Sequence, residues 1–363
     1  MNPVLSVWLD LCRVLAAVFV FLGHAVGLEV APSVMSKVWH RSADDAVTVF
    51  FVISGLVIAY ATARSHGTWR DYALARMSRV YSVALLAVVF AYVVDKVGMQ
   101  IRVEEYAPEW QYPRPWLFMP FHWAFLGETW AGSIQPFSAA PYWSLSYEVW
   151  YYVLFGCLTY GRGWWKWPLV AMVCAIMGPR IWLLMPIWWL GVGLCRFLPR
   201  WDVSVWTGRT MMVMAVLAYV AFMVSGVRDR VDAASQDWYA WFNTFLPRPF
   251  ERGATVHALS DYVVAVMFAV FVLGCARSGL AFSQRRERLV KWLASYTFTF
   301  YLVHFTLLTF CLALGQRTVG WGTFAVITAV IILISWAVAQ VGEQRRGVYR
   351  RWFDAVLPGG RKA

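Results

Sequence analysis

Runs of mainly apolar residues, separated by short polar stretches, cover almost the whole chain. A helix needs about 20 such residues to cross a bilayer. We expect ten transmembrane helices, at residues 5–28, 46–63, 80–97, 142–160, 168–179, 181–198, 210–226, 258–276, 292–314 and 321–341. The fifth is short and ends at Gly178-Pro179-Arg180, so it is predicted to be re-entrant or to form one broken hairpin with the sixth. The pattern predicts an all-α polytopic membrane protein.

The composition supports a bilayer as the solvent of this chain. Of its 363 residues, 60% are apolar and only 14% are charged, whereas soluble proteins carry about 25% charged residues. The net charge is +12, but the basic residues lie in short patches between apolar segments and form no continuous stripe. Nucleic acid is therefore excluded as a partner. The six cysteines lie in or beside apolar segments without metal-ligand spacing, so no metal site is predicted.

The distribution of Lys and Arg predicts that both termini are cytoplasmic. With the N-terminus inside, the inside segments hold 20 basic residues, and the longer outside loops hold 11. We expect one transmembrane domain over residues 1–345 and a basic cytoplasmic tail over 346–363. The long outside loops, 98–141 and 227–257, are interpreted either as a lid or acceptor platform or as connections packed on the lipid interface.

Two ionisable residues of the first predicted helix are candidates for chemistry. An Arg at the centre of a membrane helix costs at least ~2.5–3.5 kcal/mol, so a buried charge there is a functional candidate. Arg13 and His24 are eleven residues apart, which places them on nearly the same helix face and about 16 Å apart along the axis. Arg13 suits phosphate binding, and His24 suits general base catalysis. Alternatively, Arg13 pairs with Asp10 and His24 donates to a carbonyl, which would make them packing residues.

The fourth predicted helix opens with YWSLSYEVWYY and carries Glu148 about two turns from its outer end. His24 is expected at a similar depth, where a carboxylate can fix the tautomer of an imidazole. Ser144 and Ser146 can hydrogen-bond in the same region, although Ser in membrane helices often bonds its own backbone. Neither lies in a nucleophile-elbow context, so a nucleophilic serine is the weaker interpretation.

Three further candidates lie elsewhere in the sequence. Arg76 and Arg79, in RDYALARMSRVY, are one turn apart at the start of the third helix and can clamp phosphates. The excess of basic residues on the cytoplasmic side also explains arginines at this place. His304 lies mid-span in SYTFTFYLVHF and is interpreted either as a supporting partner of the site or as a core histidine. A structural ion pair of Glu148 with Arg13 or His304 is the alternative to a catalytic carboxylate.

Two other features have mainly structural interpretations. The run TVFFVISGLVI contains Ser54 and Gly55, whose small size allows neighbouring helices to approach closely. Glu343, in VGEQRR at the end of the last helix, is predicted to pair with Arg345 or Arg346.

Five segments occur in an order that resembles the acyltransferase-3 family, the bacterial membrane-bound O-acyltransferases that modify surface sugars. The segments are LDLCRVLAAVFVFLGH, FFVISGLVI, RMSRVY, YWSLSYEVWYY and SYTFTFYLVH. The resemblance extends from Leu9 to about Glu343. Departures are Cys12 where glycine is common, Ser82 where proline often follows the tyrosine, and Thr48 where an acidic residue is frequent. All basic, imidazole and carboxylate groups named above are retained.

The resemblance implies a ten-helix protein of the bacterial inner membrane that takes acyl-CoA, most simply acetyl-CoA, from the cytoplasm. Arg13, Arg76 and Arg79 would bind the phosphates of the donor. His24 would deprotonate an acceptor hydroxyl or transiently carry the acyl group, and Glu148 would orient His24. The acceptor would be an extracytoplasmic or lipid-linked glycan.

Four residues are expected to support this site: Asp10, Ser144, Ser146 and His304. The alternative function is a transporter or flippase of an anionic or lipid-linked substrate, since the same charges can bind and relay such a substrate. Against it, the sequence has no pair of Gly/Pro-broken helices in matching halves, as inverted-repeat transporters have.

Overall fold

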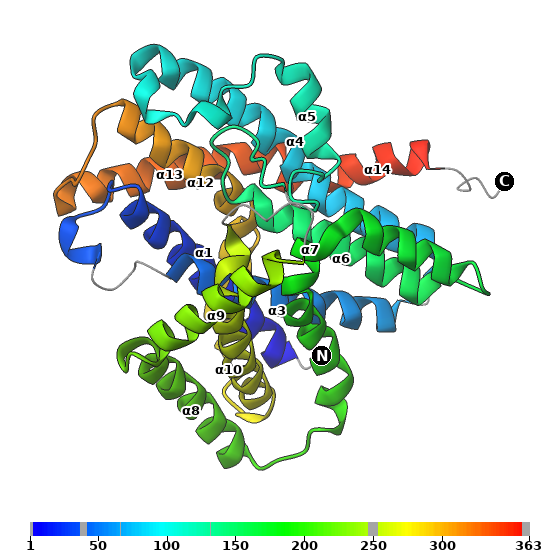
Figure 1. Cartoon of the computed structure of the whole chain (residues 1–363). Helices are drawn as coiled ribbons and strands as arrows, with labels where there is room; N and C mark the ends of the chain where they lie inside the picture. Colours follow the sequence, from blue (N-terminus) through cyan, green and yellow to red (C-terminus); the bar gives the residue numbers. More distant parts are fainter. Residues whose placement is uncertain (1–2, 37–41, 66, 131, 246–252, 358–363) are drawn as a thin grey trace.

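All regular elements in the described part of the chain are helices (Figure 1). The computed structural model describes residues 3–36, 42–65, 67–130, 132–245 and 253–357. The longer helices are α1 (Pro3–Gly27), α3 (Ser42–Arg64), α4 (Trp69–Ile101), α6 (Tyr142–Tyr160), α7 (Lys166–Phe197), α8 (Val205–Val224), α10 (Ala258–Arg277), α12 (Thr297–Ala313) and α13 (Trp321–Val341). The shorter ones are α5 (Pro115–Trp123), α9 (Val227–Asn243), α11 (Gln284–Ala294) and α14 (Arg346–Val356). Six short 3-10 helices are η1 (Ser33–Met35), η2 (Val103–Glu105), η3 (Pro108–Trp110), η4 (Leu198–Arg200), η5 (Ala254–His257) and η6 (Glu343–Arg345).

The fold is that of a multi-pass membrane protein, as predicted. Within the described residues, seven helices are long and apolar enough to cross a membrane: α1, α3, α4, α7, α8, α10 and α13. The pair α11 and α12, bent by 49°, meets the same requirement together as an eighth span. The ten predicted segments all fall on helices, but the fifth and sixth are the two halves of α7. The count of ten and the cytoplasmic placement of the termini remain predictions.

Helix α7 contains the break that the sequence predicts. Gly178 has φ 74° and ψ 169°, a backbone conformation that favours glycine, and Pro179 follows without an N–H to donate. The loop residue Trp130 occupies the break, because its N–H donates to the carbonyl of Met177 at 3.2 Å. A Cβ on Gly178 would lie 2.7 Å from the Trp130 Cα. The break therefore admits the loop that precedes α6.

A buried ion pair holds the same loop. Arg180, directly after the break, lies 3.4 Å from a Glu128 carboxylate oxygen, and the two side chains are 1% and 2% exposed. Arg180 also donates to the carbonyl of Gly132 at 2.6 Å. Separation of the two side chains would leave each charge buried without compensation, which is strongly unfavourable. The ion pair therefore fixes the loop against α7. The ion pair could not be predicted from the sequence, which shows only two residues of opposite charge.

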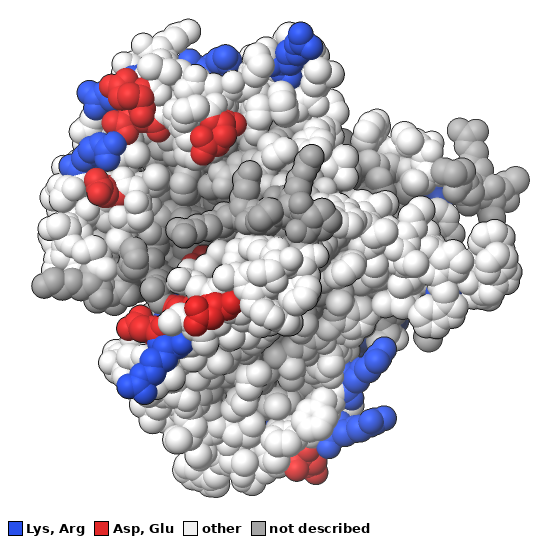
Figure 2. Space-filling view, in the orientation of Figure 1, with Lys and Arg blue, Asp and Glu red and all other residues white. Residues whose placement is uncertain are grey.

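The long segment between α4 and α6 has a small core of its own. Its anchor is Asp95 of α4, whose carboxylate accepts from the Ser138 N–H at 2.8 Å. His122 is buried, with its ring 6.1 Å from that of Tyr112. Burial lowers the pKa of His122 to about 4, so its imidazole is neutral. Figure 2 shows that charged side chains on this face of the molecule stand in small groups on a mostly uncharged surface.

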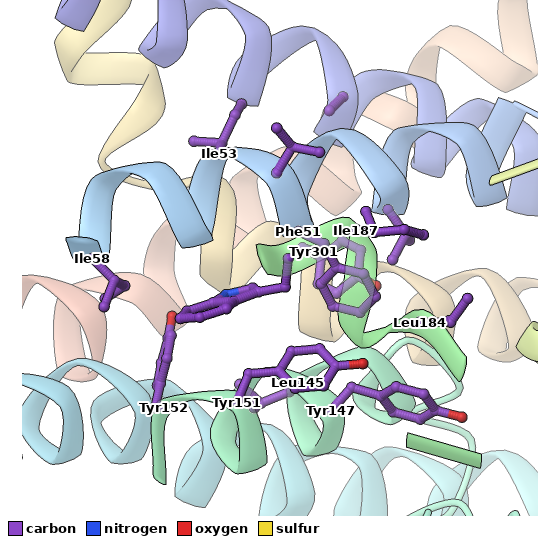
Figure 3. Packing of buried hydrophobic residues seen from close by; sticks show 14 of the residues in the cluster. Phe51, Ile53, Ile58, Leu145, Tyr147, Tyr151, Tyr152, Leu184, Ile187 and Tyr301 are labelled. Atoms are coloured by element: carbon purple, nitrogen blue, oxygen red, sulfur yellow. The ribbon is translucent and has the colours of Figure 1, made fainter. Parts of the chain in front are cut away.

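Glycines bring α3 and α7 into close contact, as predicted for Ser54 and Gly55. A Cβ on Gly55 would overlap the backbone carbonyl of Trp188, and one on Gly191 would lie 2.8 Å from the backbone N of Leu56. The close approach lets the Trp188 indole N–H donate to the Ser54 hydroxyl at 3.1 Å. Aromatic side chains of α6 complete this buried cluster (Figure 3).

The first part of the predicted tail forms α14 and packs on α4. Arg70 lies 2.6 Å from an Asp354 carboxylate oxygen. The Phe353 ring is buried, 5.3 Å from the ring of Tyr81. The predicted boundary at residue 345 falls between η6 and α14. This placement brings basic residues of the tail beside the start of α4.

We expect Gly191→Ala to destabilise the protein, because the added methyl group meets backbone atoms of α3 that cannot give way. Overpacking of this kind costs about 1–3 kcal/mol. The melting temperature in lipid nanodiscs measures the effect. Gly193→Ala is the matched control, since nothing lies within 4 Å of a Cβ at that position. Equal melting temperatures for the two variants would contradict the packing argument.

Candidate active site

A pocket between five helices collects most of the residues that the sequence predicted for donor binding. It lies between α1, α3, α4, α6 and α12, and its polar lining is Arg13, Ser54, Arg76, Arg79, Ser144, Glu148, Tyr152, Thr297 and Tyr301. The structure therefore brings the three predicted arginines to one place. We call this cavity the arginine pocket.

A capping motif fixes where α4 begins and therefore where two of these arginines lie on the helix. The Thr68 side chain caps the helix and accepts from the Asp71 N–H at 3.4 Å, while the Asp71 carboxylate accepts from the Thr68 N–H at 2.8 Å. This reciprocal capping box satisfies two backbone donors. Arg76 and Arg79 follow one turn apart and share one face of α4.

Arg13 reaches the arginine pocket from α1 and is paired. Its Nη1 lies 3.0 Å from the Asp10 carboxylate, one turn earlier. The pairing that the sequence offered as an alternative is therefore present. The side chain of Arg13 is 17% exposed and still lines the pocket. Asp10 thus offsets the charge of Arg13 without removing it from the pocket.

A directed chain of hydrogen bonds holds Glu148. The Trp188 indole, which can only donate, bonds the Ser54 hydroxyl at 3.1 Å. Ser54 in turn donates to the Tyr152 hydroxyl at 3.1 Å, and Tyr152 donates to the Glu148 carboxylate. Each hydroxyl therefore has one donor and one acceptor role, and the carboxylate at the end of the chain is fixed in the arginine pocket.

His24 and His304 form a second polar pair, farther along α1. The His24 Nδ1 lies 2.9 Å from the His304 Nε2, and the His304 Nδ1 lies 2.9 Å from the carbonyl of Phe300. A carbonyl only accepts, so the His304 Nδ1 carries the proton, and in the neutral imidazole its Nε2 is then an acceptor. His24 must then donate through Nδ1. The order of bonds leaves the lone pair of the His24 Nε2 available as a base.

The structure places His304, and not Glu148, against His24. The sequence expected Glu148 to meet His24 because both lie at similar counted depths in oppositely directed helices. Glu148 instead lies in the arginine pocket, one turn from Tyr152. Similar counted depth on two helices does not determine which side chains meet. His304 is 280 residues from His24, and only the packing of α12 on α1 brings them together.

Two side chains of the arginine pocket lie on its side toward the histidine pair. The hydroxyls of Ser144 and Tyr301 are 2.7 Å apart, and the Tyr301 ring is 6.2 Å from that of His304. Ser144 also donates to the carbonyl of Pro141, as expected for a helix serine. Ser146 is buried on α6 outside the residues that line the pocket. Ser144 is therefore the serine that faces the site.

The interpretation of Glu343 was wrong. Its carboxylate accepts from the N–H and the hydroxyl of Thr299, at 3.0 and 2.8 Å, and so caps the start of α12 instead of pairing with Arg345 or Arg346. Arg346 donates to the carbonyl of Ala75 at 2.9 Å. A free N–H in the first turn of α12 is thus satisfied by a charged acceptor from the end of α13.

Tyr152 and Tyr301 were not predicted as site residues. Tyr152 follows Glu148 by four residues, and this spacing could have indicated contact on one helix face. Tyr301 had no comparable signal, because its partner Ser144 comes from another helix.

The comparison with known families identifies one family over most of the chain. The model of the acyltransferase domain of the acyltransferase-3 family matches residues 6–340. No curated protein and no solved structure matches the chain. The matched range contains the arginine pocket and the histidine pair. The resemblance found in the five sequence segments is thereby confirmed, and the chain belongs to the acyltransferase-3 family of membrane proteins.

Proposed function

We propose that this protein transfers an acyl group, most simply acetyl, from cytoplasmic acyl-CoA to a hydroxyl of an extracytoplasmic or lipid-linked glycan in the bacterial inner membrane. The observation that carries the proposal is the convergence of Arg13, Arg76 and Arg79 on one pocket, with an imidazole base farther along the same first helix. A family of acyltransferases supplies the general chemistry.

The arginine pocket suits the phosphates of coenzyme A. Guanidinium groups bind phosphate through paired donors and keep their charge. A groove of about 550 Å³ between α4 and α6 adjoins the pocket and shares Arg76 and Tyr152 with it. Its aromatic wall includes Trp69 and Tyr72, which suit the adenine ring. The pantetheine arm would then extend past Tyr301 toward the histidine pair.

The histidine pair suits base catalysis of the transfer. The lone pair of the His24 Nε2 would take the proton of the acceptor hydroxyl while the hydroxyl oxygen attacks the thioester carbonyl. The C–O bond forms, the C–S bond breaks, and the departing thiolate receives the proton from His24. His304 accepts from the His24 Nδ1–H throughout, so it keeps the imidazole in the required tautomer.

We expect His24→Ala to abolish acyl transfer while the protein still inserts into the membrane. Loss of a general base lowers kcat by about 10²–10⁴-fold. The measurement follows labelled acetyl from acetyl-CoA to glycan in membrane vesicles. Full acylation by the variant would reject the assignment of His24, and labelled substrate that crosses unmodified would favour the transporter or flippase.

We expect His304→Leu to lower kcat and to change the pH dependence of kcat, because His24 loses the acceptor that fixes its tautomer. His304→Gln keeps an acceptor oxygen and should recover part of the activity. The KM for acetyl-CoA should stay the same in both variants, since His304 lies outside the arginine pocket. Equal kcat and pH profiles for the Leu and Gln variants would exclude a positioning role.

Arg79→Gln should raise the KM for acetyl-CoA at least tenfold. A hydrogen bond to a charged group contributes about 1.5–3 kcal/mol, and about 1.4 kcal/mol corresponds to a factor of ten. Arg288→Gln on the exposed face of α11 is the control, because it also removes one basic residue but lies outside the pocket. An unchanged KM in Arg79→Gln, or an equal rise in the control, would count against phosphate binding here.

A further inference from the structure

The outside loop that precedes α6 contains a groove that the donor and the base do not use. It lies between η3 with its following residues and the segment after Gly132, and its volume is about 740 Å³. Sites for small molecules span about 300–1,000 Å³. The lining residues are Pro108, Glu109, Trp110, Gln111, Tyr112, Pro113, Phe118, Ser133, Ile134 and Gln135. We call it the loop groove.

The wall of the loop groove combines aromatic rings with planar polar groups. Trp110 and Tyr112 offer ring faces, Gln111 and Gln135 offer amides, and Glu109 offers a carboxylate. A sugar ring has apolar C–H faces and a rim of hydroxyls that both donate and accept, so it needs this combination. None of the residues lining the groove is basic, which disfavours a phosphate or another polyanion.

Hydrogen bonds across the groove hold its aromatic side chains in place. The Trp110 indole N–H donates to the Gln135 side-chain oxygen at 3.3 Å, and the Tyr112 hydroxyl donates to the Gln135 backbone carbonyl. The Gln111 amide donates to the carbonyl of Tyr106 at 3.3 Å. The Gln135 NH₂ group keeps its own donors for a ligand. Fixed aromatic rings lose little conformational entropy when a ligand binds.

One end of the loop groove lies a single side chain away from the proposed base. The Trp110 ring is 6.3 Å from the Phe305 ring, and the Phe305 ring is 5.0 Å from that of His24, both edge to face. Phe305 of α12 therefore joins the groove to the histidine pair.

We propose that the loop groove binds a neutral glycan chain, with Trp110 under one sugar ring, and presents the neighbouring hydroxyl to His24. The proposal rests on the proposed function for the acceptor role, whereas the sugar-binding site itself stands on the lining of the groove. It assigns glycan recognition to residues 108–113 and 133–135 of the loop.

The test uses the full chain in nanodiscs and three neutral probes: cellotetraose, maltotetraose and chitotetraose. Calorimetry without donor measures binding of each probe, and initial rates at saturating acetyl-CoA measure transfer to it. Trp110→Ala should raise the Kd and the acceptor KM at least tenfold, equivalent to about 1.4 kcal/mol. Trp110→Phe keeps a ring face, so its Kd and acceptor KM should lie between those of Trp110→Ala and those of the wild type.

A matched control and a second variant keep the test decisive. Trp116→Ala removes a tryptophan of the same loop that is 66% exposed and outside the groove, so binding should not change. Gln111→Ala alters an exposed groove residue with little effect on folding, and it should weaken binding severalfold even if Trp110→Ala fails to fold.

The outcomes separate this inference from the proposed function. Probe binding that is lost in Trp110→Ala and weakened in Gln111→Ala supports the groove, even if the wild type transfers no acetyl group. If Trp110→Ala and Gln111→Ala bind the probes and transfer the acetyl group as well as the wild type does, the groove inference is overturned and the transferase proposal stays intact. Failure of all three probes to bind the wild type would also overturn it.

Discussion

The arrangement of this protein depends on the electrostatic cost of holding guanidinium groups within a membrane domain. Three arginines line one pocket, and Glu148 is the carboxylate among the residues that line it. Asp10 offsets Arg13 from outside the pocket. Together these five groups leave one excess positive charge, which an anion from the aqueous phase can neutralise. A phosphate-bearing donor of the kind proposed would therefore stabilise the pocket.

The first helix separates the two halves of the proposed reaction. Arg13 and His24 stand about 16 Å apart along α1, a length that an extended cofactor arm must bridge. Phosphate recognition therefore does not crowd the imidazole, and the imidazole stays in an apolar setting beside Phe305. The neutral tautomer is fixed by a carbonyl of α12 through His304, and no carboxylate is needed for this purpose.

The parts predictable from the sequence are those that one helix determines. Apolar runs located the helices, Gly178 located the break in α7, and the spacing of Arg76 and Arg79 placed them together. The contact of His24 with His304 could not be predicted, because the two residues are 280 positions apart and only the packing of α12 on α1 brings them together. The number of membrane spans has a related difficulty. Helix α6 carries hydroxyls and a carboxylate that its neighbours satisfy, so its composition alone does not identify it as a membrane helix.

One departure from the family pattern lies at a buried polar contact between two helices. Thr48 stands where an acidic residue is frequent, and its hydroxyl donates to the Asp261 carboxylate at 3.3 Å. Both side chains are buried, at 3% and 4% exposure, at the contact of α3 with α10. Nearby, Asp45 of α3 is paired with Arg228 at 2.7 Å. The Thr48 hydroxyl therefore satisfies one lone pair of a buried carboxylate that α10 supplies, while α3 supplies the neighbouring carboxylate of Asp45.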